Sequence, residues 1–344
     1  MRSLAFVLVT PLLGCTGTVV SGEEAPMSDA PTGGSDDGGG TVTMMPPPTR
    51  GFQIASPGID IMPNEDSTYC YYFKTSNPDQ MDVQRWASQM GPGVHDVVLY
   101  FTPTVLKTVG TMNPSGCAVA DGTTGTAWSY AAHPGDPEVR MPSDDGTGTP
   151  VGQVVKAEQP GFLQIHVRNT TASMVHADVA INAYAYPADV QTTHATPFTT
   201  LNVNELNNHI MVKAGTANNP TTGTVGGDCM ITPDPSGKPI KFFGITTYTH
   251  KQGVHTVVKD GASKIFESTS WEHPGTMTSP QFYTFQSGTL SYQCDYLNGN
   301  AYTIMSGDDV TTQEMCMAIG YFFPAPPPPN NFSGHFCIDS FVLY

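Results

Sequence analysis

The stretch Gly161-Phe162-Leu163-Gln164-Ile165-His166-Val167 is rich in the aromatic and β-branched residues that favour β-strands. Similar short runs recur from residue 51 onward, with turn residues such as Asn298-Gly299 between them. The runs are Thr68–Lys74, Asp96–Thr102, Phe162–Arg168, Ala177–Tyr184, Ile210–Lys213, Lys241–His250, Val254–Lys259, Leu290–Tyr296, Met317–Phe323 and Phe336–Tyr344. Only Met81–Ser88 suggests a short helix. Many short strands without helical spacers predict an all-β fold of two consecutive antiparallel, jelly-roll-like β-sandwiches.

The length of 344 residues favours two domains over one, with a boundary near Pro187–Pro197. We therefore expect one sandwich over residues 51–190 and a second over residues 191–344. Lys and Arg number 14 against 30 Asp and Glu, which makes the formal net charge −16. Such acidity disfavours nucleic acids and anionic lipid headgroups as partners.

The N-terminus reads as a targeting segment. Met1-Arg2 precedes an apolar run, Leu4–Leu13, that is too short to span a bilayer. The run ends in Leu12-Leu13-Gly14-Cys15, which resembles the lipobox of bacterial lipoproteins and implies that residues 1–15 are a signal segment with Cys15 lipidated. The alternative is an ordinary signal peptide with an incidental cysteine. Both alternatives predict export.

Residues 16–50 are rich in Gly, Ser, Thr, Asp and Pro, so this stretch is predicted to be a flexible linker. We expect the membrane to be touched only through the lipid on Cys15. Thr16 follows that cysteine, where lipoproteins retained in the inner membrane typically carry Asp. This favours anchoring to the cell envelope at the outer membrane.

Four segments place histidine or methionine within or beside predicted strands. They are Gly93–Phe101, Gly161–Val167, Tyr248–Gly253 and Glu314–Pro324. In this order they resemble the copper type II, ascorbate-dependent monooxygenases, the family of dopamine β-monooxygenase and peptidylglycine α-hydroxylating monooxygenase. The resemblance extends over roughly residues 55–344, the whole expected globular part.

The resemblance implies up to two copper ions per chain. His95 and His166 match ligands of the copper that receives electrons from ascorbate or another reductant. His250 and Met315 match ligands of the copper that binds O2 and hydroxylates a C–H bond. Imidazole suits both copper oxidation states, and a thioether favours Cu(I).

Six cysteines remain after Cys15, and an even number in an exported chain predicts three disulfides. Six cysteines allow 15 pairings, and the sequence alone does not choose among them. The resemblance implies the pairs Cys70–Cys117, Cys229–Cys337 and Cys294–Cys316. The last pair has the family's separation of 22 residues.

Two ligand positions of the family are changed. Asp96 stands where the second histidine of a pair is expected, and Tyr248 stands where His-Thr-His begins. Both side chains are candidate oxygen ligands, although hard oxygen ligands serve Cu(I) poorly. His255 is disfavoured as a substitute because residues five apart on a strand point to opposite faces. His176 has no spacing argument for assisting His166.

Two functions follow from the resemblance. The first is a copper-dependent, ascorbate-type monooxygenase that hydroxylates a small molecule or peptide. The alternative is a non-catalytic copper-binding or surface interaction module on the same scaffold. Thr246 stands where the peptidylglycine enzyme has a carboxylate-binding arginine, so a peptide ending in glycine is not expected as substrate. The sequence identifies neither the substrate nor the oligomeric state.

Overall fold

The computed structural model describes residues 44–114, 117, 126–201, 210–231, 237–277, 280–307, 310–326 and 334–338. The expected signal segment, Cys15 and most of the expected linker lie outside these residues. Both sandwiches described below belong to one compact unit, Val42–Tyr344. At its start, the Pro46 carbonyl accepts a 2.8 Å hydrogen bond from Asn182.

The described residues form β-strands and no helix, which confirms the expected all-β class. The strands of the first half are β1 (Gly51–Ala55), β2 (Ile59–Ile61), β3 (Asp66–Lys74), β4 (Met81–Met90), β5 (Val94–Phe101), β6 (Met112–Asn113), β7 (Ala127–Ala132), β8 (Glu138–Arg140), β9 (Val151–Val155), β10 (Pro160–Arg168), β11 (Val175–Ala177) and β12 (Val179–Ala185). Those of the second half are β13 (Thr193–Leu201), β14 (Met211–Val212), β15 (Thr221–Met230), β16 (Lys241–Tyr248), β17 (Gly253–Asp260), β18 (Ser263–Ser268), β19 (Thr289–Asn298), β20 (Ile304–Ser306), β21 (Gln313–Glu314), β22 (Met317–Phe323) and β23 (His335–Ile338).

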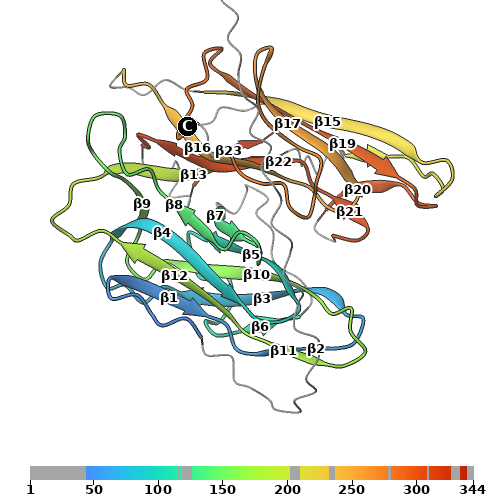
Figure 1. Cartoon of the computed structure of the whole chain (residues 1–344), viewed down its shortest axis with the longest axis horizontal. Helices are drawn as coiled ribbons and strands as arrows, with labels where there is room; N and C mark the ends of the chain where they lie inside the picture. Colours follow the sequence, from blue (N-terminus) through green and yellow to red (C-terminus); the bar gives the residue numbers. More distant parts are fainter. Residues whose placement is uncertain are drawn as a thin grey trace, which may run out of the picture. The chain divides into compact units, whose positions relative to one another are not determined.

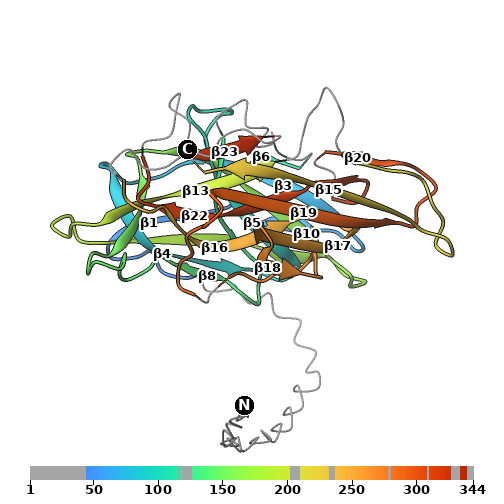
Figure 2. The ribbon, with the colours of Figure 1, turned by 90° about the horizontal axis from the view of Figure 1, so that it is seen from above.

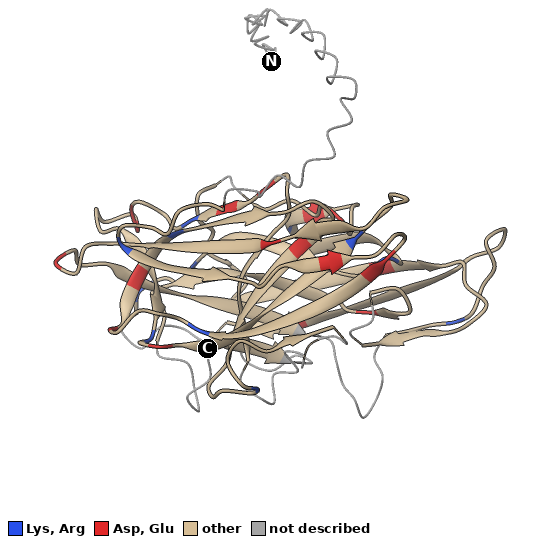
Figure 3. Ribbon diagram, turned by 90° about the horizontal axis from the view of Figure 1, so that it is seen from below, with Lys and Arg blue, Asp and Glu red and all other residues tan. Residues whose placement is uncertain are grey.

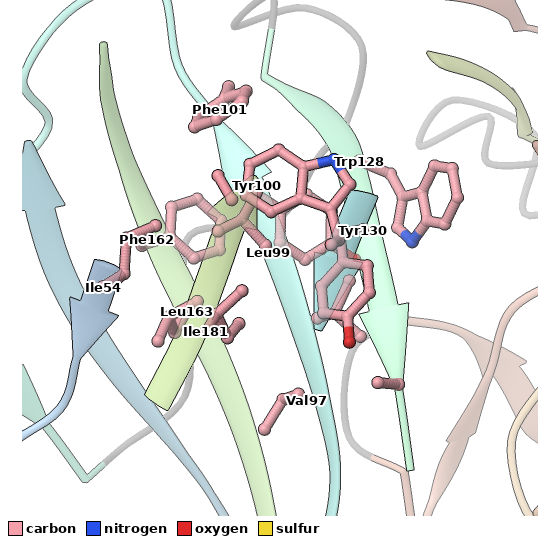
Figure 4. Close-up of a cluster of buried hydrophobic side chains, with 14 of the residues drawn as sticks. Ile54, Val97, Leu99, Tyr100, Phe101, Trp128, Tyr130, Phe162, Leu163 and Ile181 are labelled. Atoms are coloured by element: carbon pink, nitrogen blue, oxygen red, sulfur yellow. The ribbon is translucent and has the colours of Figure 1, made fainter. Parts of the chain in front are cut away.

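In the first half, the sheet β6-β3-β10-β5-β7 packs against strands β1, β12, β4 and β9 of a second sheet (Figure 1). Side chains from both sheets fill the space between them, among them Ile54, Ile181 and Leu163 (Figure 4). The Trp86 ring of β4 lies 5.8 Å from the Tyr130 ring of β7, so aromatic contacts also join the two layers.

The second half is a sandwich of β13-β22-β16, with β23 beside β13, and the sheet β15-β19-β17-β18 (Figures 1 and 2). Its core includes Phe198, Phe242 and Phe322. The Cys229–Cys337 disulfide joins β15 to β23 and so links the two layers. Cys294–Cys316 and Cys70–Cys117 are the other two disulfides, so all three pairs implied by the resemblance are present.

Strand β13 connects the halves. Its first residues pair in parallel with β9 and its last residues pair antiparallel with β22, so one sheet runs through both sandwiches. Side chains cross the same junction: the Tyr321 hydroxyl donates to the Ser129 carbonyl at 2.7 Å, and the Trp128 and Tyr321 rings lie 5.2 Å apart. Two hydrophobic cores are therefore held together by backbone and side-chain contacts.

The expectation of a helix over Met81–Ser88 is wrong. The segment is part of β4, which pairs with β12 on one side and with β8 and β9 on the other. Val83 and Trp86 are fully buried in the first core. Burial of these side chains within a sheet outweighs the modest helix propensity of Met, Gln, Arg and Ala.

The buried side chain of His335 in β23 allows the packing of the second half to be tested by the pH dependence of stability. Its Nε2–H donates to the Pro326 carbonyl at 3.2 Å, and its ring contacts Phe322. Burial lowers the pKa of His335 to about 4, from 6.5, although the hydrogen bond to Pro326 acts to raise it. His335 therefore binds a proton more readily in the unfolded chain than in the folded one. The stability that comes from burying its neutral ring should be fully present above pH 6.5 and should be lost as the pH falls towards 4.

We predict that His335→Leu removes up to about 3 kcal/mol of the difference in unfolding free energy between pH 7 and pH 4. Urea unfolding of the oxidised protein at both values measures this difference. His194→Gln, at a side chain that is 50% exposed, is the control and should leave the acid limb unchanged. An equal pH dependence in wild type and His335→Leu would contradict the prediction.

Candidate metal centre

A β-bulge brings two consecutive residues of β5 into one cluster. His166 of β10 is paired with Asp96, whereas its neighbour Val167 is paired with Val94, so His95 is the extra residue. Consecutive side chains of a regular strand point to opposite faces, and the bulge removes that restriction. One ligand atom from each of His95, Asp96 and His166 lies within 4.8 Å of the others.

His166 is held between two carboxylates. Its Nδ1 lies 3.1 Å from Asp96 Oδ2 and its Nε2 lies 2.8 Å from Asp66 Oδ1. Burial alone would lower the pKa of His166, but hydrogen bonds and charge from Asp96 and Asp66 raise it to about 9. An ion that binds His166 must therefore displace a proton.

Asp96 is the shared acceptor of the cluster. It faces His166 and also lies 3.0 Å from His95 Nδ1. Burial acts to raise the pKa of Asp96, but the hydrogen bonds from His166 and His95 lower it to about 2. The carboxylate is ionised at neutral pH and offers negative charge to a cation or to two imidazoles.

A loop of the second half covers His95. The Trp271 ring stacks beside the His95 ring, with centroids 6.1 Å apart and planes 20° apart. Glu272 Oε1 lies 3.3 Å from Arg168 Nη1 and 3.9 Å from His95 Nε2. The cluster built by β5 and β10 is thus completed by residues more than a hundred positions further along the chain.

A cavity of about 110 Å³ lies between the two halves at this cluster. Its lining includes His95, Asp96 and His166 from the first half and Tyr248 and His250 from the second. The Tyr248 and His250 rings are 5.5 Å apart and nearly perpendicular. Three positions that match ligands of the family and both changed positions therefore line a single space.

Glu314 fixes the turn that carries His250. Its buried carboxylate accepts hydrogen bonds from the backbone N–H groups of His250, at 2.8 Å, and Gln252, at 2.6 Å. The His250 Nδ1–H donates to the Gln313 carbonyl at 2.9 Å, which sets the ring orientation as in many metal-bound histidines. Burial raises the pKa of Glu314 to about 7, against the lowering effect of those backbone N–H groups.

The remaining candidates lie elsewhere. Met315 is 8% exposed, belongs to the first hydrophobic core and is absent from the described lining of the cavity. His255 lies 2.8 Å from Asp295 and 2.9 Å from Glu267, away from that lining. His176 contacts Asp60 at the surface rather than His166.

Sequence reasoning missed five residues at or beside the cluster: Asp66, His133, Trp271, Glu272 and His273. The His133 and His273 rings are 4.5 Å apart, and the His273 ring is 6.1 Å from that of His95. Burial and the neighbouring His273 lower the pKa of His133. One signal was available, because both histidines begin a His-Pro-Gly tripeptide.

A scan against protein-family models finds no match, and a search of curated proteins finds none either. None of the described residues forms a helix with the length and apolar character required to cross a bilayer. Acidic side chains outnumber basic ones along the described ribbon (Figure 3), in line with the net charge of −16.

We predict that Glu314→Ala lowers the free energy of unfolding by about 2–4 kcal/mol, because it leaves the buried N–H groups of His250 and Gln252 unpaired. Urea unfolding measures the loss. Glu314→Gln retains an acceptor oxygen and should lose less. An alanine variant as stable as the wild type would show that Glu314 does not hold this turn.

Proposed function

We propose that this chain is a copper-binding redox protein built on the scaffold of the copper type II monooxygenases, with its metal at the cluster around His95. The observation that carries this proposal is the convergence of His95, Asp96 and His166 within 4.8 Å at the wall of a cavity. The four sequence segments that resemble that family supply the choice of metal.

The donor set fits copper. Two imidazoles and a carboxylate suit Cu(II), and the Irving–Williams order favours copper over other first-row divalent ions. Bound copper would supply one-electron exchange between its two oxidation states. The protein's part is to orient His95 through Asp96, to keep Trp271 over the His95 ring and to offer negative charge at Asp96.

Hydroxylation of a C–H bond is the second candidate. It is favoured by one observation: Tyr248 and His250 line the same cavity as the first cluster. The reaction consumes one O2, two electrons and two protons and yields the alcohol and water, with ascorbate or another reductant as the electron source. The position of Met315 in the core favours copper binding over this reaction.

Export and lipid anchoring at Cys15 complete the proposal. The three disulfides suit an oxidising compartment outside the cytoplasm. An acidic surface disfavours nucleic acid, and the substrate or electron acceptor is expected to be a small molecule or a peptide.

We predict that the purified chain binds Cu(II) stoichiometrically and that His95→Ala abolishes tight binding, because His95 is one of the two imidazoles of the cluster. Competitive titration against a chelator measures the affinity. His176→Ala is the matched control, since His176 also pairs with an aspartate but lies at the surface of the same sandwich.

Adding ascorbate to the copper-loaded chain distinguishes the copper-binding redox protein from the hydroxylase. Loss of the Cu(II) resonance without O2 uptake supports the copper-binding redox protein. Copper-dependent O2 uptake that disappears in His250→Ala and Met315→Ala supports hydroxylation. A chain that stays free of copper after loading overturns both.

A further inference from the structure

The cavity between the halves is lined by one sheet face from each half. In the first half, Asp96 and Val98 are two residues apart in β5, so both point to the same face of the sheet. Ala131 of β7 is paired with Val98 and shares that face. In the second half, Thr246 of β16 is paired with Ile319 of β22. All five residues line the cavity, so it is enclosed by parts of both sandwiches.

Away from the metal cluster, the lining of the cavity is apolar. Val98 and Ile319 are 4% and 3% exposed and belong to the first hydrophobic core. Ala131 lines the cavity beside Val98, and Tyr248 and Trp271 add aromatic rings from the second half. Burial against such a lining is favourable for hydrocarbon, and aromatic side chains pack especially well against another aromatic ring.

The charges in the lining are already compensated. Among the described residues that line the cavity there is no lysine or arginine. The Asp96 carboxylate lies 3.1 Å from His166 Nδ1. The Glu272 carboxylate lies 3.3 Å from Arg168, and Asp136 is exposed, where water screens its charge. A charged ligand would lose its hydration here without gaining an opposite charge in return, so an uncharged ligand is favoured.

The size of the cavity excludes large ligands. Its volume is about 110 Å³. Pockets for drug-sized ligands measure roughly 300–1,000 Å³, whereas an apolar cavity of ~150 Å³ is enough to bind benzene. A peptide is therefore too large for this space, and a molecule of about seven non-hydrogen atoms is of the right size.

We propose that the cavity between the halves binds a small, uncharged molecule that consists of a single aromatic ring with little substitution. The ring packs against Val98 and Ile319 and shares the cavity with His95, Asp96 and His166. The inference rests on the proposed function in one respect: a molecule held beside the metal cluster is the substrate of the hydroxylation reaction, in place of a peptide. Binding of the ring itself requires no copper.

The experiment compares toluene with N-methylpyridinium, which has nearly the same size and shape but carries one positive charge. Benzoate supplies a negative charge. Each is titrated into the metal-free, oxidised full chain while methyl signals are followed by nuclear magnetic resonance. We expect toluene to shift the signals of Val98 and Ile319 and to leave Val258, in the second core, unchanged. Both ions should bind at least ~10-fold more weakly than toluene.

A cavity-filling variant provides a second measurement. Ala131→Leu occupies part of the space beside Val98 and should weaken toluene binding at least ~10-fold. Ala55→Leu makes the same change at an exposed position at the end of β1 and should bind toluene as the wild type does. Thermal melting shows whether Ala131→Leu is folded, and the methyl shifts of the wild type test the proposal without any variant.

Three results would overturn the inference: no toluene binding by the folded wild type, methyl shifts confined to residues outside the cavity, or an ion that binds more tightly than toluene. The proposed function is tested separately by competitive titration of the wild type with Cu(II). A chain that binds copper but not toluene retains the proposed function and loses this inference. A chain that binds toluene but not copper retains the binding site and loses the proposed function.

Discussion

The hydrogen bonds of Asp96 organise this molecule's candidate site. A half-buried carboxylate needs compensating partners, and it finds them in His166 across the sheet and in His95 beside it. The contact with His95 exists only because a β-bulge turns two consecutive residues to one side. Without the bulge, His95 would point away from Asp96 and the cluster would lose one of its two imidazoles.

Residues of the second half complete the candidate site that β5 and β10 of the first half begin. The loop after β18 brings Trp271, Glu272 and His273 against His95, and Glu272 reaches Arg168 of β10. These contacts require the two sandwiches to keep a fixed position and orientation relative to each other. Strand β13 fixes this arrangement, because it pairs with β9 of the first half and with β22 of the second. The cavity is therefore a product of the junction rather than of either sandwich.

Local patterns predicted the fold better than the site. The apolar run Met317–Phe323 coincides with β22, because a strand buried along its whole length shows in composition alone. The helix predicted over Met81–Ser88 was wrong, because the burial of Trp86 between two sheets outweighs the helix propensity of the residues in this segment. The disulfide pairs followed from resemblance, since 15 pairings were open on spacing alone.

The site depended on contacts far apart in sequence. His95 and His166 were identified by motif, and neighbouring strands bring them together. His133 and His273 were missed because 140 positions separate them, and only the repeated His-Pro-Gly linked them. Met315 was predicted as a ligand from the resemblance of its segment to the copper monooxygenases, but burial in a core also explains a methionine there.

The most direct measurement is a crystal structure of the copper-loaded chain with anomalous diffraction recorded at the copper edge. The account predicts an anomalous peak within coordination distance of a His95 ring nitrogen, on the wall of the cavity between the halves. A fully loaded crystal with its peak away from His95, or with no peak, would contradict it.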